Sequence, residues 1–368
     1  MVDFALAGDQ AKQNWSNAIT REYVRSSGFL PYMGKGSIFN LQNELGSNAG
    51  AIVHVPALGK LRGAVVRGCN PLVGNEDAQA SYSMRVETDI VRTAIAIKLC
   101  TSFRTEMDLY NEGKAAIKTR LAEALRDDLI VALQSIPIPG TSTGTNPEDF
   151  AVSYAASTAA QKNAWLTANN DRVLFGNKKS YTTAGNVATS LATLNTNLAT
   201  SKMSAQSLSL ARKMARQTTN SGTFAIEPYR TSTGEEWYVL FVDSNGYRDL
   251  KFDPVIYSAN LNARPRETDI KENPIFSGTN NFTYDGVIVV EIPELPVVAT
   301  NIGLASLCGV QAVNVAWTMK ARPDRRKEDD YGMVAGIAGT EIRGQQKATV
   351  NLVQVGMLSW FHPSQDDA

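Results

Sequence analysis

Histidine, the side chain best suited to acid–base chemistry near neutral pH, occurs only twice in this chain of 368 residues. His54 lies in the apolar run Ile52–Val55, which favours an ordinary strand position over a general base. His362 stands beside Pro363 near the end of the sequence, where we expect a solvated tail. Neither setting supports an acid–base site.

The cysteines are equally uninformative about catalysis. Cys69, Cys100 and Cys308 are the only three, and no two of them form a C-x-x-C pair. The spacing therefore indicates neither a zinc site nor a disulfide framework, and we expect reduced, buried thiols.

Two glycine-containing stretches resemble ligand-binding loops but depart from them. Gly34–Ser37 follows Gly28 with five intervening residues instead of the four of a phosphate loop, and Gly36 stands where Ser or Thr should hold magnesium. Asp243–Gly246 begins like a calcium loop but lacks its later acidic residues, so we expect a tight turn between two strands. We therefore expect no enzyme and no cofactor.

Composition limits the classes of partner. Lys and Arg total 36, Asp and Glu total 36, and the formal net charge is zero. A dedicated nucleic-acid binder needs excess cations, whereas zero charge suits a subunit that packs against copies of itself. The sequence contains no apolar stretch long enough for a membrane span and no signal-peptide pattern at its start. We expect a protein that stays soluble in a cytoplasm.

The first hundred residues predict an arm and a hairpin. Residues 1–50 are mixed in character, with one amphipathic piece at Trp15–Tyr23. The apolar run 51–56 and the alternating segment 81–98 predict two long paired strands. Such a hairpin is marginal in water unless something covers it. It either folds back on its own domain or docks on a neighbouring subunit. Its polar tip carries the charges Lys60, Arg62, Arg67, Glu76 and Asp77.

A long amphipathic helix is predicted over residues 105–136. A capping box at Thr105–Asp108 opens it and Pro137 ends it. Gly113 weakens its first turns. Its apolar stripe recurs every four residues, at Ile117, Leu121, Leu125, Leu129 and Leu133.

The remaining sequence mixes helices and strands, which places the chain in the α+β class. We expect an extended loop over 137–160 and two helices within 186–217, broken near Ser201. Strands are predicted at 237–242, 286–292, 313–319 and 349–361. The segment 320–330 mixes charges of both signs, which favours a solvated or intersubunit loop.

Several motifs in this order resemble the capsid family of tailed phages of the N-four type, which has the Hong Kong 97-like capsid fold. The resemblance spans about residues 50–358. The residues that carry it are Asp171–Gly176, Ile226–Pro228, Tyr238–Val242, Asp249–Lys251, Asn273–Gly278, Tyr284–Glu291, Asp330–Gly332, Gly336–Ala338 and Ile342–Lys347.

The resemblance implies a division of the chain. Residues 1–50 would be the N-terminal arm, 51–100 the extended hairpin loop, 101–254 the peripheral domain with its spine helix, 255–345 the axial domain, and 346–368 a strand returning to the peripheral domain. Contacts between subunits would involve the hairpin tip and, in the axial domain, Arg322, Arg325, Arg326, Glu328 and Asp329.

The implied function is that of a major capsid protein. Copies would assemble into hexamers and pentamers of an icosahedral head around double-stranded DNA, held without sequence specificity on the inner face. Partners would be other copies and a portal, with scaffolding or decoration proteins as further candidates, and no membrane. The chain would be assembled in the host cytoplasm and end in the virion. Two alternatives stay open: a cellular nanocompartment shell around protein cargo, and an enzyme with an unrecognised site.

Overall fold

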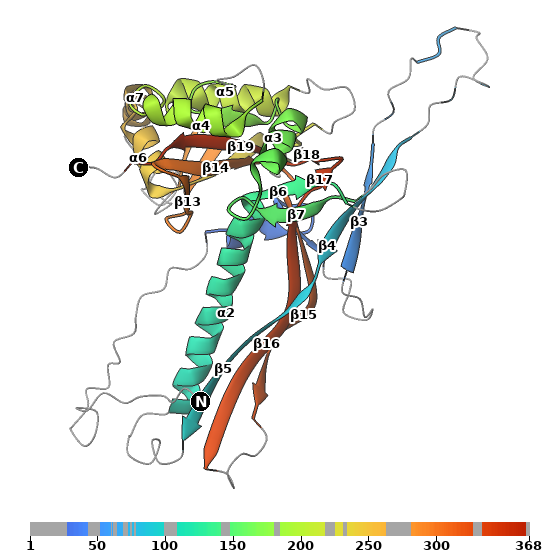
Figure 1. Cartoon of the computed structure of the whole chain (residues 1–368), viewed down its shortest axis with the longest axis vertical. Helices are drawn as coiled ribbons and strands as arrows, with labels where there is room; N and C mark the ends of the chain where they lie inside the picture. Colours follow the sequence, from blue (N-terminus) through green and yellow to red (C-terminus); the bar gives the residue numbers. More distant parts are fainter. Residues whose placement is uncertain are drawn as a thin grey trace.

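Strands that are far apart in the sequence form two large sheets, which divide the molecule into a body, a stalk and a protruding hairpin (Figure 1). The structure is a computed structural model. It describes residues 28–42, 52–59, 61, 65–68, 73, 76, 79–98, 109–140, 148–179, 185–217, 225–230, 234–262, 281–326 and 333–365.

The body is built on an eight-stranded sheet whose central path runs β11-β12-β10-β14-β19-β8. Its strands are β8 (Val173–Phe175), β9 (Tyr229–Arg230), β10 (Glu236–Val242), β11 (Asn281–Tyr284), β12 (Val287–Glu291), β13 (Val297–Ala299), β14 (Ile302–Cys308) and β19 (Met357–Pro363). Its helices are α3 (Ala159–Ala168), α4 (Val187–Thr196), α5 (Ala205–Arg216), α6 (Ser244–Phe252) and α7 (Pro254–Asn262).

Both faces of the body sheet are covered. Leu240 and Val242 of β10 pack with α5, whereas Val239 and Phe241 pack with the end of α2 (Leu109–Leu133). The continuous apolarity of this strand predicted that burial, and the prediction is confirmed. The two predicted helices broken near Ser201 are confirmed as α4 and α5.

The stalk is a five-stranded sheet with α2 lying along it. Its strand order is β1 (Met33–Gly34), β2 (Phe39–Gln42), β15 (Val313–Arg325), β16 (Val334–Lys347) and β5 (Asp89–Lys98). The predicted apolar stripe of α2 is confirmed, because all five of its residues are buried. The expected capping box at Thr105–Asp108 lies outside the described residues. Gly113 faces Ile337, Ile95 and Ile97 at ordinary contact distances.

The hairpin is shorter than predicted. β3 (Ile52–Leu58) pairs with β4 (Ser81–Glu87), but the chain then changes sheet at Thr88, and β5 pairs with β16. The crossing is possible because Gly344 has no side chain: a Cβ there would lie 1.9 Å from the carbonyl oxygen of Glu87. One face of β3–β4 is buried against Ala316, Ala348 and Val350.

The grouping of segments differs from the expected division at residue 254. β10, expected in the peripheral domain, lies between β12 and β14, and residues 313–345, expected in the axial domain, pack against α2 as β15 and β16. The final strand β19 lies inside the body sheet beside β14. Long-range strand pairing decides the grouping here. A strand inside a sheet must hydrogen-bond to a neighbour on each side, because its buried backbone groups need partners.

Four local predictions were wrong. β6 (Ser135–Ile138) pairs antiparallel with β7 (Phe150–Ser153), where an extended loop was expected. Residues 320–325, expected in a loop, belong to β15. Asp243 does not make a turn between strands but caps α6, accepting a hydrogen bond from the Gly246 amide at 3.0 Å. The terminal strand is interrupted: β17 (Thr349–Val350) and β18 (Val353–Gln354) are joined by Asn351 and Leu352 at positive φ.

Candidate contact surfaces

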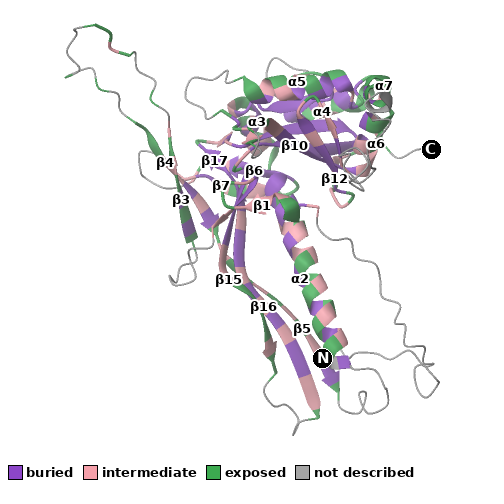
Figure 2. Ribbon diagram, turned by 180° about the vertical axis from the view of Figure 1, so that it is seen from behind, coloured by how far each residue is buried: buried purple, intermediate pink, exposed green. Residues whose placement is uncertain are grey.

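The tip of the hairpin projects away from both the body and the stalk (Figure 1). Its described apolar side chains are largely exposed, Val65 to 82% and Val73 to 84%, with Leu58 and Leu61 above 60%. Figure 2 colours the described parts of this tip mostly as exposed. A group of exposed aliphatic side chains on a protrusion is typical of a surface that meets another molecule.

Two of the five charged residues expected at the tip are described. Arg67 and Glu76 are both exposed. Lys60, Arg62 and Asp77 lie outside the described residues. The exposed valines and leucines were missed as contact candidates, although the sequence shows Val65, Val66, Leu72 and Val73 between glycines, where no core could form around them.

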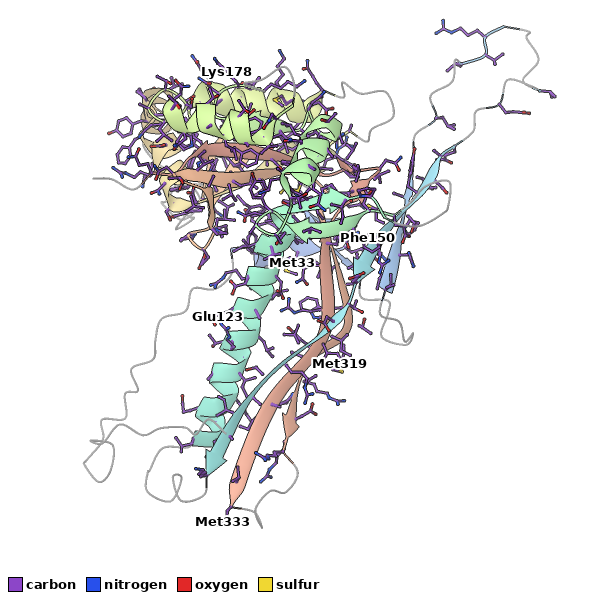
Figure 3. The ribbon with its side chains drawn as sticks, in the orientation of Figure 1. Met33, Glu123, Phe150, Lys178, Met319 and Met333 are labelled. Atoms are coloured by element: carbon purple, nitrogen blue, oxygen red, sulfur yellow. The ribbon has the colours of Figure 1, made fainter. Side chains whose placement is uncertain are left out.

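The base of the hairpin is fastened to the β6–β7 segment by two contacts. The Nδ1 atom of His54 lies 2.7 Å from Oε1 of Glu148, and the guanidinium of Arg85 lies 4.5 Å above the ring of Phe150 (Figure 3). Burial acts to raise the pKa of Glu148, but hydrogen bonds from Ser83 and His54 outweigh it and lower that pKa. The strand position predicted for His54 is confirmed.

A second group of charges lies at the far end of the stalk, where Figure 3 labels Met333. Arg322 pairs with Asp324 at 3.3 Å, and Arg322, Arg325 and Arg326 are exposed. The structure places these residues on or next to β15, beside α2 and away from residues 281–308 of the body. Glu328 and Asp329 lie outside the described residues. The hairpin tip and the stalk end are therefore two separate surfaces.

A buried polar cluster joins the body to the stalk. The Lys347 ammonium group donates to the Ser135 carbonyl at 2.6 Å and to Oε1 of Gln354 at 3.1 Å. Arg172 donates to the carbonyls of Gln354 and Val355. The amide of Asn169 donates to the Leu352 carbonyl at 2.7 Å. These bonds hold the β17–β18 turn between the two parts.

Burial changes the ionisation of two groups in this region. It lowers the pKa of Lys347 to about 7, since a dry interior disfavours the charged amine. It raises the pKa of the Cys308 thiol to about 12 for the opposite reason. Cys308 is buried and free, as predicted; Cys69 and Cys100 lie outside the described residues. Lys347 was noticed in the sequence only as part of a family motif.

His362 is not in a solvated tail, and this prediction was wrong. Its side chain is 1% exposed, with Nε2 3.2 Å from Oδ1 of Asp243, and the Ser364 hydroxyl donates to the same carboxylate. The Ser364 hydroxyl also accepts a hydrogen bond from the Asn245 side chain at 3.3 Å. These contacts join the start of α6 to β19.

The described residues contain no group of three or more His, Cys, Asp or Glu side chains that could hold a metal ion. Among the same residues, no helix combines the length and apolarity needed to cross a membrane.

Comparison with known proteins identifies the family. A family model described as "Phage capsid protein" matches residues 4–358. The capsid structure of cyanophage Pam1 is 31% identical over 100% of both chains, with a TM-score of 0.81. No curated protein sequence matches.

More distant structures share the fold. The capsid of Ralstonia phage GP4 is 20% identical, with a TM-score of 0.71 over 100% of this chain and 99% of that one. The capsid of Helicobacter pylori phage KHP30 is 13% identical, with a TM-score of 0.66 over 96% and 94%. The Hong Kong 97-like fold expected from the motifs is thereby confirmed, and the nanocompartment alternative is not favoured. The chain belongs to the phage capsid protein family, in which it is a major capsid protein of a tailed phage.

Proposed function

We propose that copies of this chain assemble into the hexamers and pentamers of an icosahedral head around double-stranded DNA, and that the hairpin tip is a principal contact between neighbours. The observation that carries the proposal is the exposure of Val65 and Val73 on a protrusion with a folded base. Burying these side chains on a neighbour stabilises the assembly, at roughly 25 cal/mol per Å² of apolar surface removed from water.

The charges of the tip supplement the apolar contact. Lys60, Arg62, Arg67, Glu76 and Asp77 would pair with opposite charges on the adjacent subunit. Each exposed ion pair contributes only about 0–1 kcal/mol, so many weak contacts summed over neighbours hold the shell.

The stalk end supplies a second contact in this proposal. Arg322, Arg325 and Arg326, with Glu328 and Asp329, would face neighbouring subunits at the end of β15 and β16. Their exposure supports the proposal, and their ionic character predicts that assembly weakens with rising salt.

A defined deletion tests the role of the tip. The Gly59 amide donates to the Ala80 carbonyl at 2.8 Å, which is the last rung of the hairpin. Replacing residues 60–79 by Asn-Gly closes the strands with a two-residue turn and keeps their register. We expect a folded subunit with unchanged circular dichroism that forms no shells by electron microscopy. Closed shells from this variant would refute the role.

A matched variant separates the apolar part of the contact from the charged part. Changing Lys60, Arg62 and Arg67 together to Ala removes the cations and keeps the valines. We expect shells to form more slowly, with a smaller effect of salt on the rate. If the charge variant fails as completely as the deletion, the apolar contact is not the principal one.

The remaining parts of the proposal concern the contents and place of the shell. DNA would be held without sequence specificity in virions assembled in the host cytoplasm, with a portal as a partner and scaffolding or decoration proteins as further candidates. The chain would have no catalytic activity, which its membership of a structural capsid family supports. Nuclease-protected DNA in purified particles tests the genome; particles with protein cargo alone would contradict it.

A further inference from the structure

An apolar groove of about 420 Å³ runs between α2 and the outer half of β15 and β16. Its walls include Ile117, Leu121 and Ala122 from the helix, with Pro323 and Ile337 from the strands. The exposed cations Lys114, Lys118 and Arg322 also line it, together with the buried carboxylate of Glu341, which pairs with Arg343 at 2.6 Å. A groove with apolar walls and a few placed charges is a typical docking site for an amphipathic helix.

The groove opens at the β15 edge of the stalk sheet. β2 pairs with β15 only from Val313 to Ala316, and beyond that point β15 has no second strand partner among the described residues. Register shifts around Met319 and the missing amide hydrogen of Pro323 interrupt this edge. Adding another strand is therefore disfavoured, and the uncovered surface is suited to side chains that pack from above.

The first described residues of the chain lie beside the same groove. Phe29 is fully buried in one cluster with Leu125 and Leu129 of α2, and Leu125 also lines the groove. Residues 1–27 precede this point and lie outside the described residues. From Leu125 to Lys114 the helix spans about 16 Å at 1.5 Å per residue, well within the reach of that many residues.

The sequence of this segment is complementary to the groove. On a helix, Trp15, Ala18, Ile19 and Tyr23 share one face. Glu22 falls in the middle of that face, so docking would bury its carboxylate, which is costly unless a cation pairs with it. The groove offers apolar walls for the first four residues and, in the exposed Lys118, a cation for the carboxylate. Arg322 is already paired with Asp324.

We propose that residues 15–23 dock as an amphipathic helix in the α2–β15 groove of the same chain. The hairpin tip is a poorer occupant, because its charges include three cations that would meet Lys114, Lys118 and Arg322. The inference does not rest on shell formation, since it concerns the single subunit.

Disulfide trapping tests the docking in the full-length chain. Ala18→Cys combined with Ala122→Cys should give an intramolecular disulfide in unassembled subunits under mild oxidation, mapped by peptide mass spectrometry. The matched control pairs Ala18→Cys with Val131→Cys, which is 52% exposed and lies nine residues along α2 on the opposite face. We expect at least tenfold more of the 18–122 disulfide than of the 18–131 disulfide.

Three outcomes would overturn the proposal. Equal yields of the two disulfides, or no 18–122 disulfide, would mean that the segment does not occupy the groove. A disulfide found only between subunits, seen as a covalent dimer on a denaturing gel, would assign the groove to the segment of a second copy.

Limited proteolysis tests the docking without relying on a disulfide. Ala122→Trp fills the groove and should speed tryptic cleavage after Arg21 and Arg25 at least fivefold, while the thermal midpoint of the subunit stays within a few degrees. Unchanged cleavage in a folded Ala122→Trp subunit would contradict the docking. Because both measurements use unassembled subunits, their failure is distinct from failure to form shells.

Discussion

Valines in two regions of this molecule have opposite fates. In β10 of the body, Val239 and Val242 are completely buried between the sheet and its covering helices, whereas Val65 and Val73 of the hairpin tip are more than four-fifths exposed. The body buries its apolar surface within one chain. The tip cannot, because no described element of its own chain lies over it (Figure 2). Stability of the subunit and stability of the shell therefore depend on different residues.

The largest loss of stability is expected in the body. Phe361 is fully buried and stacks on Phe175 with ring centroids 5.0 Å apart. Phe361→Ala should cost about 3–5 kcal/mol of unfolding free energy, because it removes apolar contact and leaves a cavity. Denaturant unfolding measures this. Phe252→Ala, at a position 68% exposed on α6, is the matched control, with an expected change below about 0.5 kcal/mol. Equal losses of unfolding free energy in the two variants would show that burial in the body does not decide the stability of the subunit.

A smaller loss is expected where the hairpin crosses the stalk. Gly344→Ala forces a Cβ against the Glu87 carbonyl, and a clash of this kind typically costs about 1–3 kcal/mol. Gly113→Ala is the control, because its Cβ meets only ordinary contacts and alanine favours a helix by about 1 kcal/mol. Thermal unfolding of the two variants should shift in opposite directions; a neutral Gly344→Ala would show that the crossing tolerates a side chain.

The junction between body and stalk should depend on pH through Lys347. Its folded pKa, about 7, lies below the ordinary lysine value of 10.5, so between these values the unfolded chain binds more protons and stability rises with pH. The rise is at most about 1.4 kcal/mol per pH unit. Lys347→Met should remove it, as measured by denaturant unfolding at pH 7.0 and 8.5.

Two points sharpen this measurement. Lys118→Met changes an exposed lysine and should leave the pH dependence intact. The measurements stay at or below about pH 8.5 because of Cys308. Above about pH 9 its thiol ionises in the unfolded chain but not in the folded one, where its pKa is raised, and this lowers stability as pH rises. If Lys347→Met keeps the wild-type slope, the lysine is not the source of the dependence.

The smallest effect on the subunit is expected at the tip. Val65→Ser combined with Val73→Ser should change the unfolding free energy by less than about 0.5 kcal/mol, since both side chains are already in water. The same variant should reduce shell formation strongly, as counted by electron microscopy. Normal shells would show that the tip valines stay exposed in the assembly.

The local elements of the fold could be predicted because their patterns are complete within a short segment. The stripe of α2 needs one covering surface and the continuous apolarity of β10 needs two, whatever the identity of those surfaces. The change of sheet at Thr88 was not predicted, because residues 81–98 were expected to form one strand. Its trace is the shift of apolar residues from even positions at Tyr82, Met84 and Val86 to odd positions from Val91 onward. A change of parity means a change of face.

The division into body and stalk could not be predicted in the same way. β10 finds its partners β12 and β14 far along the chain, and nothing in the local pattern names them. The burial of His362 likewise depends on Asp243, a residue more than a hundred positions away. At the tip, the sequence pointed to the charged residues as contacts and not to the valines between them. The valines become contact candidates only once their exposure is known.

The single residue between β4 and β5 gives the hairpin a mechanical role. Because the backbone continues through Thr88 into ten residue pairs with β16, a pull on the protruding loop is carried as tension along covalent bonds into the stalk ladder. A load applied to one subunit is thus spread over a long row of hydrogen bonds sheared together, which resists rupture far better than bonds opened one at a time.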